Sequence, residues 1–207
     1  MKKLRTAGIL TALAIGLTAC GTDEDAQQEA VNSLTLVRNG SVENTIIESF
    51  DKEYYDLDGL NAMIEDSIVQ YQKQNPTAEI TLVQSELTGD QVQVTMKYDS
   101  SSSYMGYNSE TLFVGTVQEA YAQGYDLNVT LKDVQDETVT ISRQELLGMG
   151  ERHIAILELP ASGDDTVSRM RLKCYGDILY TGDGVTLVSK KTADIEQTQG
   201  VSVVVFK

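Results

Sequence analysis

The feature that most limits how this chain can fold is a regular alternation of apolar and polar residues beside a short turn. In "QVQVTMKYD", the apolar residues Val92, Val94, Met96 and Tyr98 alternate with polar ones. Successive side chains of a strand point to opposite faces, so this pattern predicts a strand with one face in a core. The segment "EITLVQSEL" precedes it across Thr88-Gly89-Asp90. Together the two segments predict an antiparallel hairpin.

A second hairpin is predicted in "SLTLVRNGSVENTIIESF". Its turn is Asn39-Gly40, because both residues tolerate positive φ. Asn39-Gly40-Ser41 also spells a glycosylation sequon, and the turn is the preferred interpretation. The apolar run "HIAILEL" predicts a central strand covered on both faces. A further strand is predicted in "ETLFVG", and another where Leu127, Val129 and Leu131 alternate with polar residues. Four more are predicted over 167–175, 178–180, 185–189 and 201–206.

Three helices are predicted. The longest covers about 58–74, because apolar residues recur there at three- and four-residue spacing, with Asp56 or Asp58 as the cap. Two short helices follow capping-box patterns that begin at Thr116 and Ser142. The segment "SSSSYMGYNS" is predicted to be a polar loop.

These elements predict the α+β class, with a mostly antiparallel sheet, one long and two short helices, and a β-rich C-terminal part. The globular domain is expected over 33–207, and residues 165–207 are a possible small β subdomain. No fixed-period repeat is present, which disfavours solenoids and propellers.

The first nineteen residues have the pattern of an export signal. Lys2, Lys3 and Arg5 precede an uncharged stretch of eleven residues over 7–17, which is short for a membrane span. The stretch ends in Leu17-Thr18-Ala19-Cys20, which resembles the bacterial lipobox. The resemblance implies that a diacylglycerol is attached to Cys20 and that cleavage makes Cys20 the mature N-terminus. Residues 20–32, polar and acidic, are then expected to form a tether.

The lipobox makes the chain similar to uncharacterised membrane lipoproteins of Gram-positive bacteria. Beyond it, only "NSETLFVGTVQEAYAQGYD" and "GDILYTGDGVTLV" resemble such lipoproteins, and loosely. The resemblance implies a cell-membrane location, with the domain facing the extracytoplasmic side. It implies no activity.

Charge and cysteine content limit the function further. The formal charge is −15, and removal of 1–19 leaves thirteen basic and 31 acidic residues, a formal charge of −18. Such a field repels phosphates, so a nucleic-acid partner is not expected. Once Cys20 carries lipid, Cys174 has no partner within the chain. In "RMRLKCY" it falls on the apolar side of an alternating strand, which predicts a buried core cysteine.

The search for catalytic motifs gives mostly negative results. His153 is the one histidine, and no phosphate-binding glycine loop or Ser nucleophile elbow is present. The stretch "YYDLDGLNAMIE" places Asp56, Asp58 and Glu65 at EF-hand ligand positions, but Tyr54 occupies the first position. A capped helix is the preferred interpretation. No catalytic residue, cofactor or metal ligand is therefore assigned.

Two surface features remain as candidate sites. Tyr104 and Tyr107 lie in the Ser-rich segment and are candidate ligand contacts, although they could instead cover a sheet edge. Arg169, Arg171 and Lys173 form a basic stripe, which could bind an anionic partner or pair with acidic residues on neighbouring strands. The role of the stripe stays open at this point.

The sequence thus favours a lipid-anchored, non-enzymatic binding or interaction module of the cell envelope, with an envelope protein or glycan as partner. The alternative is a hydrolase that acts on envelope glycans with two carboxylates, because 31 Asp and Glu residues allow many such pairs. It predicts an open cleft lined by tyrosines.

Overall fold

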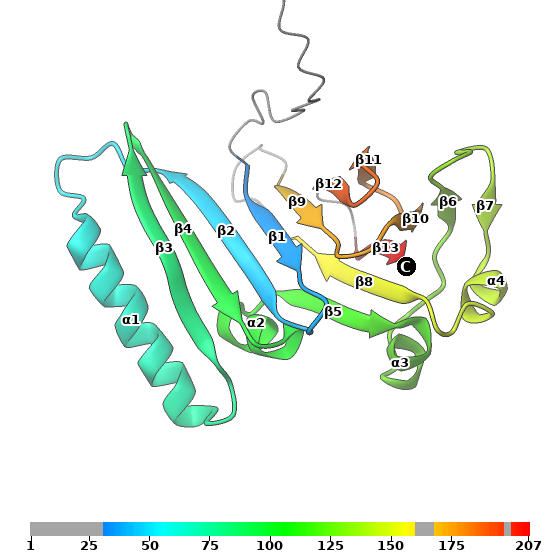
Figure 1. Cartoon of the computed structure of the whole chain (residues 1–207), viewed down its shortest axis with the longest axis horizontal. Coiled ribbons are helices and arrows are strands. Elements are labelled where there is room, and N and C mark those ends of the chain that lie inside the picture. Colours follow the sequence, from blue (N-terminus) through cyan, green and yellow to red (C-terminus); the bar gives the residue numbers. More distant parts are fainter. Residues whose placement is uncertain (1–30, 160–167, 197–199) are drawn as a thin grey trace, which may run out of the picture.

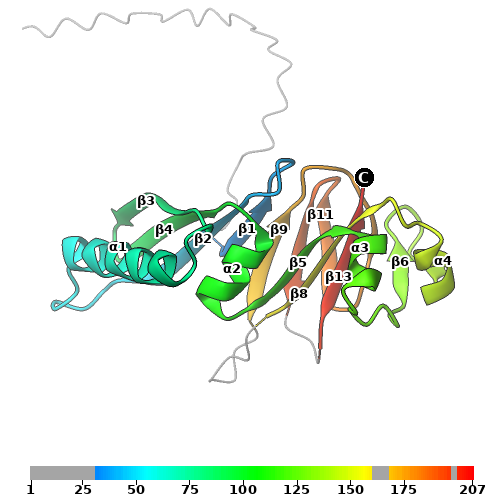
Figure 2. The same ribbon diagram turned by 90° about the horizontal axis from the view of Figure 1, so that it is seen from below.

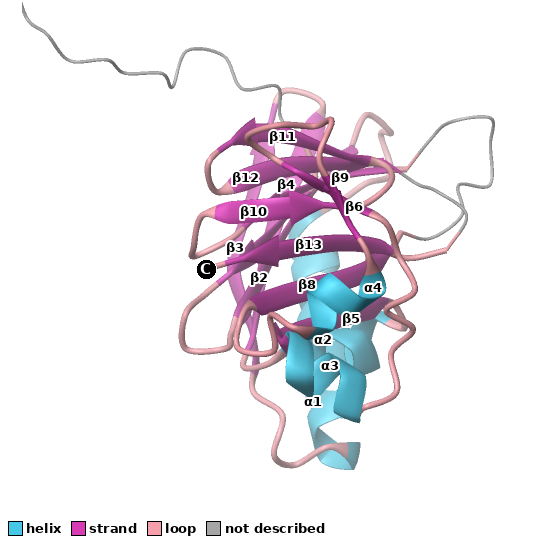
Figure 3. Ribbon diagram, turned by 90° about the vertical axis from the view of Figure 1, so that its right-hand side faces the viewer, coloured by secondary structure: helices cyan, strands magenta, loops and turns pink. Residues whose placement is uncertain are grey.

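The computed structural model describes residues 31–159, 168–196 and 200–207. Within them the chain forms two sheets and four helices (Figure 1). The helices are α1 (Leu57–Gln74), α2 (Ser101–Asn108), α3 (Val117–Ala122) and α4 (Arg143–Leu147). In Figure 3 the helices gather along one side of the molecule, and β11, β12 and β10 lie at the opposite side.

The larger sheet has seven strands. In spatial order they are β11 (Val185–Ser189), β12 (Thr192–Glu196), β9 (Arg169–Lys173), β1 (Ser33–Leu36), β2 (Val42–Ser49), β4 (Gln91–Tyr98) and β3 (Ile80–Thr88). All neighbours are antiparallel except β1 and β9, which run parallel. Strands far apart in the sequence therefore meet at the centre of this sheet.

The smaller sheet has six strands and is antiparallel throughout. Its order is β5 (Thr111–Thr116), β8 (His153–Glu158), β13 (Ser202–Phe206), β10 (Ile178–Thr181), β6 (Leu131–Asp133) and β7 (Thr140–Ile141). The strands between residues 168 and 207 are thus shared between both sheets.

Register and burial show how the layers pack. Leu34, Leu172 and Ala193 are adjacent across β1, β9 and β12, and they lie in one core cluster with Ala155 and Val204 of the smaller sheet. The same cluster extends beneath α1 and α2 over β2 and β4. A second cluster lies between the other face of the smaller sheet and the helices α3 and α4. Figure 2 shows where these two helices lie in the molecule. The smaller sheet is therefore covered on both faces.

The expected fold class, α+β with one sheet, is wrong. Strands hold 42% and helices 22% of the described residues, which makes the protein mostly β, and the strands form two sheets. Four helices are present there instead of one long and two short ones, and only two of them have seven or more residues. The physical reason is that much of the larger sheet's apolar face packs on a second sheet, whereas the alternating pattern is the same whether a sheet or a helix covers it.

Two local predictions are also wrong. The Ser-rich segment expected to be a loop forms α2, because Ser100 caps it and Tyr104 anchors it in the core with 1% of its surface exposed. No strand was expected between 189 and 201, yet β12 pairs with both β9 and β11. Ala193 and Ile195 are its buried residues.

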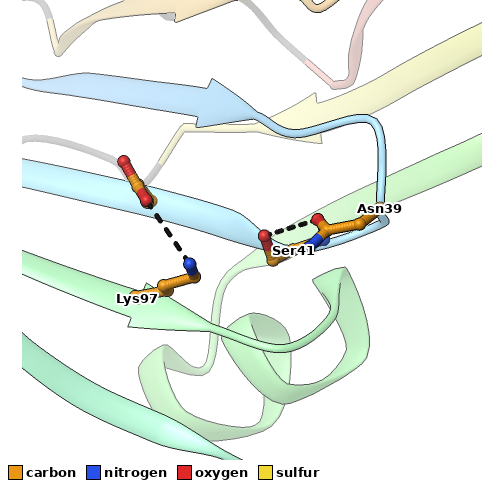
Figure 4. Close-up of polar contacts among 4 residues, drawn as sticks. Asn39, Ser41 and Lys97 are labelled. Carbon is orange, nitrogen blue, oxygen red and sulfur yellow. Dashed lines mark hydrogen bonds and ion pairs between the residues drawn. The ribbon is translucent and has the colours of Figure 1, made fainter.

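Other local predictions are confirmed. Both hairpins form, with Gly40 and Gly89 at positive φ in their turns. At the first turn, Asn39 Oδ1 accepts hydrogen bonds from the Ser41 amide at 3.0 Å and the Ser41 hydroxyl at 2.8 Å (Figure 4). The "HIAILEL" strand is β8, whose inner residues are almost fully buried.

Candidate functional site

A mainly apolar hollow lies between α1 and α2, over strands β2 and β4. We call it the α1 cavity; its volume is about 370 Å³. Its lining is mainly aliphatic and aromatic, and it comprises Ile46, Glu48, Ser49, Phe50, Tyr55, Leu60, Ile64, Val92, Val94, Met96, Tyr98, Tyr107 and Asn108. Figure 1 shows α1 beside β3, and it shows α2 near the start of β2 and the end of β4.

The cavity lies beside the N-terminal half of α1, where the apolar side chains are partly buried. Ile68 is the buried residue of this helix, and Tyr71 contacts Tyr107 edge-on at 5.6 Å between ring centroids. Toward the N-terminus, Leu60 and Ile64 are only partly buried and face the cavity. The apolar stripe that predicted this helix therefore packs on the core along its length, is fully buried at Ile68, and borders the cavity at Leu60 and Ile64.

A tyrosine cluster forms the wall of the cavity on the α2 side. Tyr98 packs against Tyr104 at 5.2 Å and against Tyr107 at 5.9 Å between centroids. Burial raises the pKa of Tyr98 to about 12 and raises the pKa of Tyr104 still further. Both rings are neutral at physiological pH; Tyr98 lines the cavity together with Tyr107, and Tyr104 supports Tyr98 from within the core.

The polar atoms of this wall are used within the protein. The Tyr104 hydroxyl donates to Glu110, and the Tyr107 hydroxyl is hydrogen-bonded to Ser67. The Tyr98 hydroxyl donates to Asn108 Oδ1 at 3.4 Å. The wall therefore offers a ligand apolar surface more than free hydrogen-bonding groups.

The two predicted ligand contacts have different positions. Tyr107 lines the α1 cavity, whereas Tyr104 is a core residue with 1% of its surface exposed. Sequence reasoning did not select Glu48, Phe50 or Tyr55, which also line the cavity. The cluster of aromatic residues in "FDKEYY" was the available signal for the last two. Nothing in the strand pattern of β2 marks Glu48 as different from other acidic residues.

Glu48 also lines a second cavity, of about 310 Å³, which lies on the same face of the sheet and extends toward β9. Ile46 and Glu48 line both cavities, so the two adjoin at this point of the strand. The second cavity is further lined by Glu110 and Asn44, and the Oδ1 atom of Asn44 is buried without a hydrogen-bond partner within the described part of the chain. The carboxylates of Glu48 and Glu110 therefore both line this second cavity.

The basic stripe is engaged in pairs across the sheet. Arg171 binds Asp194 through two hydrogen bonds of 2.7 and 2.9 Å, and Arg169 lies 3.1 Å from Glu196. Both acidic residues are the direct register partners of these arginines on β12. Cross-strand pairing, one of the two interpretations of the stripe, is therefore what the structure shows for these two side chains.

The other residues considered as candidates, His153 and Asp56, make contacts that stabilise the fold. His153 stacks on Phe206 and contacts Tyr175 edge-on. Asp56 caps α1 by accepting a hydrogen bond from the Gly59 amide at 2.9 Å, as expected of a capped helix. Across the residues that the structure describes, no group of three or more His, Cys, Asp or Glu side chains is placed to hold a metal ion.

Comparison with protein-family models, curated proteins and solved structures finds no match for this chain. None of the helices in the described ranges is long and apolar enough to cross a membrane. Cys20, the predicted lipid attachment site, lies outside the described residues.

Proposed function

We propose that this protein is a lipid-anchored, extracytoplasmic binding module of the cell envelope and that the α1 cavity is its binding site. The observation that carries the proposal is the cavity itself. Its volume of about 370 Å³ lies within the range of small-molecule sites, and its lining combines apolar side chains with a few polar groups.

The surroundings of the titratable groups favour binding over catalysis. His153 is held between aromatic rings, and the hydroxyls of Tyr98, Tyr104 and Tyr107 have partners inside the protein. A nucleophile beside an oriented base is the usual sign of covalent catalysis. Within the described residues that line the α1 cavity, no such pair is present.

The anchor can be tested separately from the cavity. The lipobox supports attachment of diacylglycerol at Cys20, and two acyl chains hold a protein on a membrane far more stably than one. We expect Cys20→Ser to move the protein from the membrane fraction to the soluble fraction. Cys174→Ser is the matched control and should remain in the membrane fraction. A Cys20→Ser protein that still sediments with membranes would contradict the anchor.

The cavity can be tested with a neutral apolar probe. We expect octanol to bind the wild-type chain and to bind Val94→Phe much more weakly, because the larger ring fills the space beneath α1. Val83→Phe is the control, since Val83 is 53% exposed and lies outside the cavity lining. Titration calorimetry gives the affinities, and circular dichroism checks that each variant is folded. Equal binding by both variants would exclude the cavity as the site.

A glycan hydrolase is the second candidate, and one observation favours it. Glu48 and Glu110 line the same cavity, and a pair of carboxylates is what glycosidases use as acid and nucleophile or base. This alternative predicts that purified protein releases reducing ends from cell-wall glycan and that Glu48→Gln and Glu110→Gln each abolish the release. No release by the wild-type chain would remove it.

A further inference from the structure

We propose that the α1 cavity takes a cationic amphiphile, a molecule with an apolar body and a positively charged amine head. The body lies between α1 and the strands β2 and β4, and the head lies at Glu48. This inference rests on the proposed binding function and adds the chemical class of the ligand.

The first step concerns which lining groups are free to select a head group. The Tyr107 hydroxyl is paired with Ser67, and Asn108 accepts from Tyr98 and donates to the Tyr104 carbonyl at 3.0 Å. Glu48 is the charged residue among the described residues that line the α1 cavity, and none of the described side chains forms an ion pair or hydrogen bond with its carboxylate. Glu48 is exposed to solvent, so its carboxylate is hydrated, and a ligand in the mainly apolar cavity meets one negative charge that no described basic side chain pairs.

The second step concerns the charges around Glu48. Glu110 lines the adjoining cavity and adds a second carboxylate. Arg169, the basic residue of that cavity, is paired with Glu196, and Lys97 lies 3.9 Å from Glu43 (Figure 4). Glu43 and Lys97 alternate with the cavity-facing residues of β2 and β4 and so belong to the opposite face of the sheet. Two carboxylates and one guanidinium line the two cavities, so negative charge is in excess around Glu48, as it is in the whole chain with its net charge of −15.

The third step concerns shape. The apolar lining lies on one side of Glu48, between Leu60, Ile64 and Val94, and the acidic cavity adjoins on the other side. A molecule that fills the first space and ends at Glu48 must be apolar along its length and polar at one end. Charge complementarity then selects a cation for that end.

The test uses a fluorescent reporter that the chain itself allows. The sequence has no tryptophan, so Phe50→Trp in the full-length chain places a single indole in the cavity lining. Octylamine, octanol and octanoate have the same number of carbons and differ in head-group charge. We expect octylamine to bind roughly three- to fivefold more tightly than octanol, as exposed ion pairs allow, and octanoate to bind most weakly. Added salt should reduce the difference.

Two matched variants decide whether Glu48 is responsible. Glu48→Gln should remove the preference for octylamine, whereas Glu86→Gln, which makes the same charge change at an exposed position of β3 outside the cavity lining, should keep it. If Phe50→Trp perturbs the fold, titration calorimetry on proteins that keep Phe50 measures the binding of the same three probes. Octanol binding without any preference for the amine would overturn this inference and leave the proposed function standing. Absence of binding by all three probes would overturn both.

Discussion

At the scale of single residues, burial determines which reactive groups are available. Cys174 is 5% exposed, as its position in the alternating strand pattern predicted. The polypeptide around it raises the pKa of its thiol to about 12, because the thiolate would lose its hydration. Tyr98 is affected in the same way. The structure therefore keeps both groups protonated at ordinary pH.

This burial predicts a defined pH dependence of stability. The pKa of the Cys174 thiol is near 9 in the unfolded chain and about 12 in the folded one, so its contribution is complete below pH 9 and is lost as pH rises toward 12. We expect the urea midpoint to fall as pH rises from about pH 9 to about pH 10.5, and to fall less in Cys174→Ala. The native thiol should also resist alkylation until the protein unfolds. Rapid alkylation of the native protein would contradict its burial.

At the scale of elements, short-range hydrogen bonds set the ends of the helices. At α3, the Glu119 carboxylate accepts from the Thr116 amide at 2.7 Å, and the Glu119 amide donates to the Thr116 hydroxyl at 3.1 Å. At α4, Glu145 accepts from the Ser142 amide and hydroxyl. Both capping patterns were readable in the sequence because they involve residues only three apart.

The α3 cap can be tested by one substitution. Thr116→Ala removes the side-chain oxygen that accepts from Glu119, and we expect it to lower the free energy of unfolding by about 1 kcal/mol. Thr130→Ala, in an exposed loop, is the control and should change it by less than about 0.5 kcal/mol. Chemical denaturation measures both, and equal effects would exclude a specific cap.

Glu119 adds a pH effect at the same cap. The Thr116 amide and hydroxyl lower the pKa of its carboxyl group, so the cap is complete at neutral pH and weakens as pH falls through that pKa. The Thr116→Ala difference should therefore shrink in acid. Stability curves of the two proteins at several pH values measure this change.

At the scale of the whole molecule, distant segments complete each other's sheets. β9 pairs with β1 over a long sequence separation, and β13 pairs with β8 over Ser202–Phe206. The inner residues of β13 are almost fully buried, with 1% or less of their surface exposed. The segment after residue 168 thus supplies central strands to both sheets and part of both core clusters.

This arrangement predicts that the chain cannot be shortened after β8. A fragment ending at residue 159 would leave one edge of β1 and one edge of β8 unpaired and would expose apolar surface on both. We expect it to be insoluble or unfolded, as judged by solubility and circular dichroism. A fragment that loses only residues 1–30 is the control and should fold. A soluble, cooperatively unfolding 1–159 fragment would show that the two parts are separate.

The sequence alone determined the features that depend on near neighbours: the two hairpin turns, the capped helices, the alternating strands and the burial of Cys174. Each follows from the backbone preferences or side-chain periodicity of a few adjacent residues. Only the tertiary structure decided that the strands form two sheets, that Ser101–Asn108 is a helix held by Tyr104, and that Glu48 lies between two cavities. These depend on which distant strands pair and on how the helices pack on the sheets, and an alternating pattern fixes neither partner nor packing.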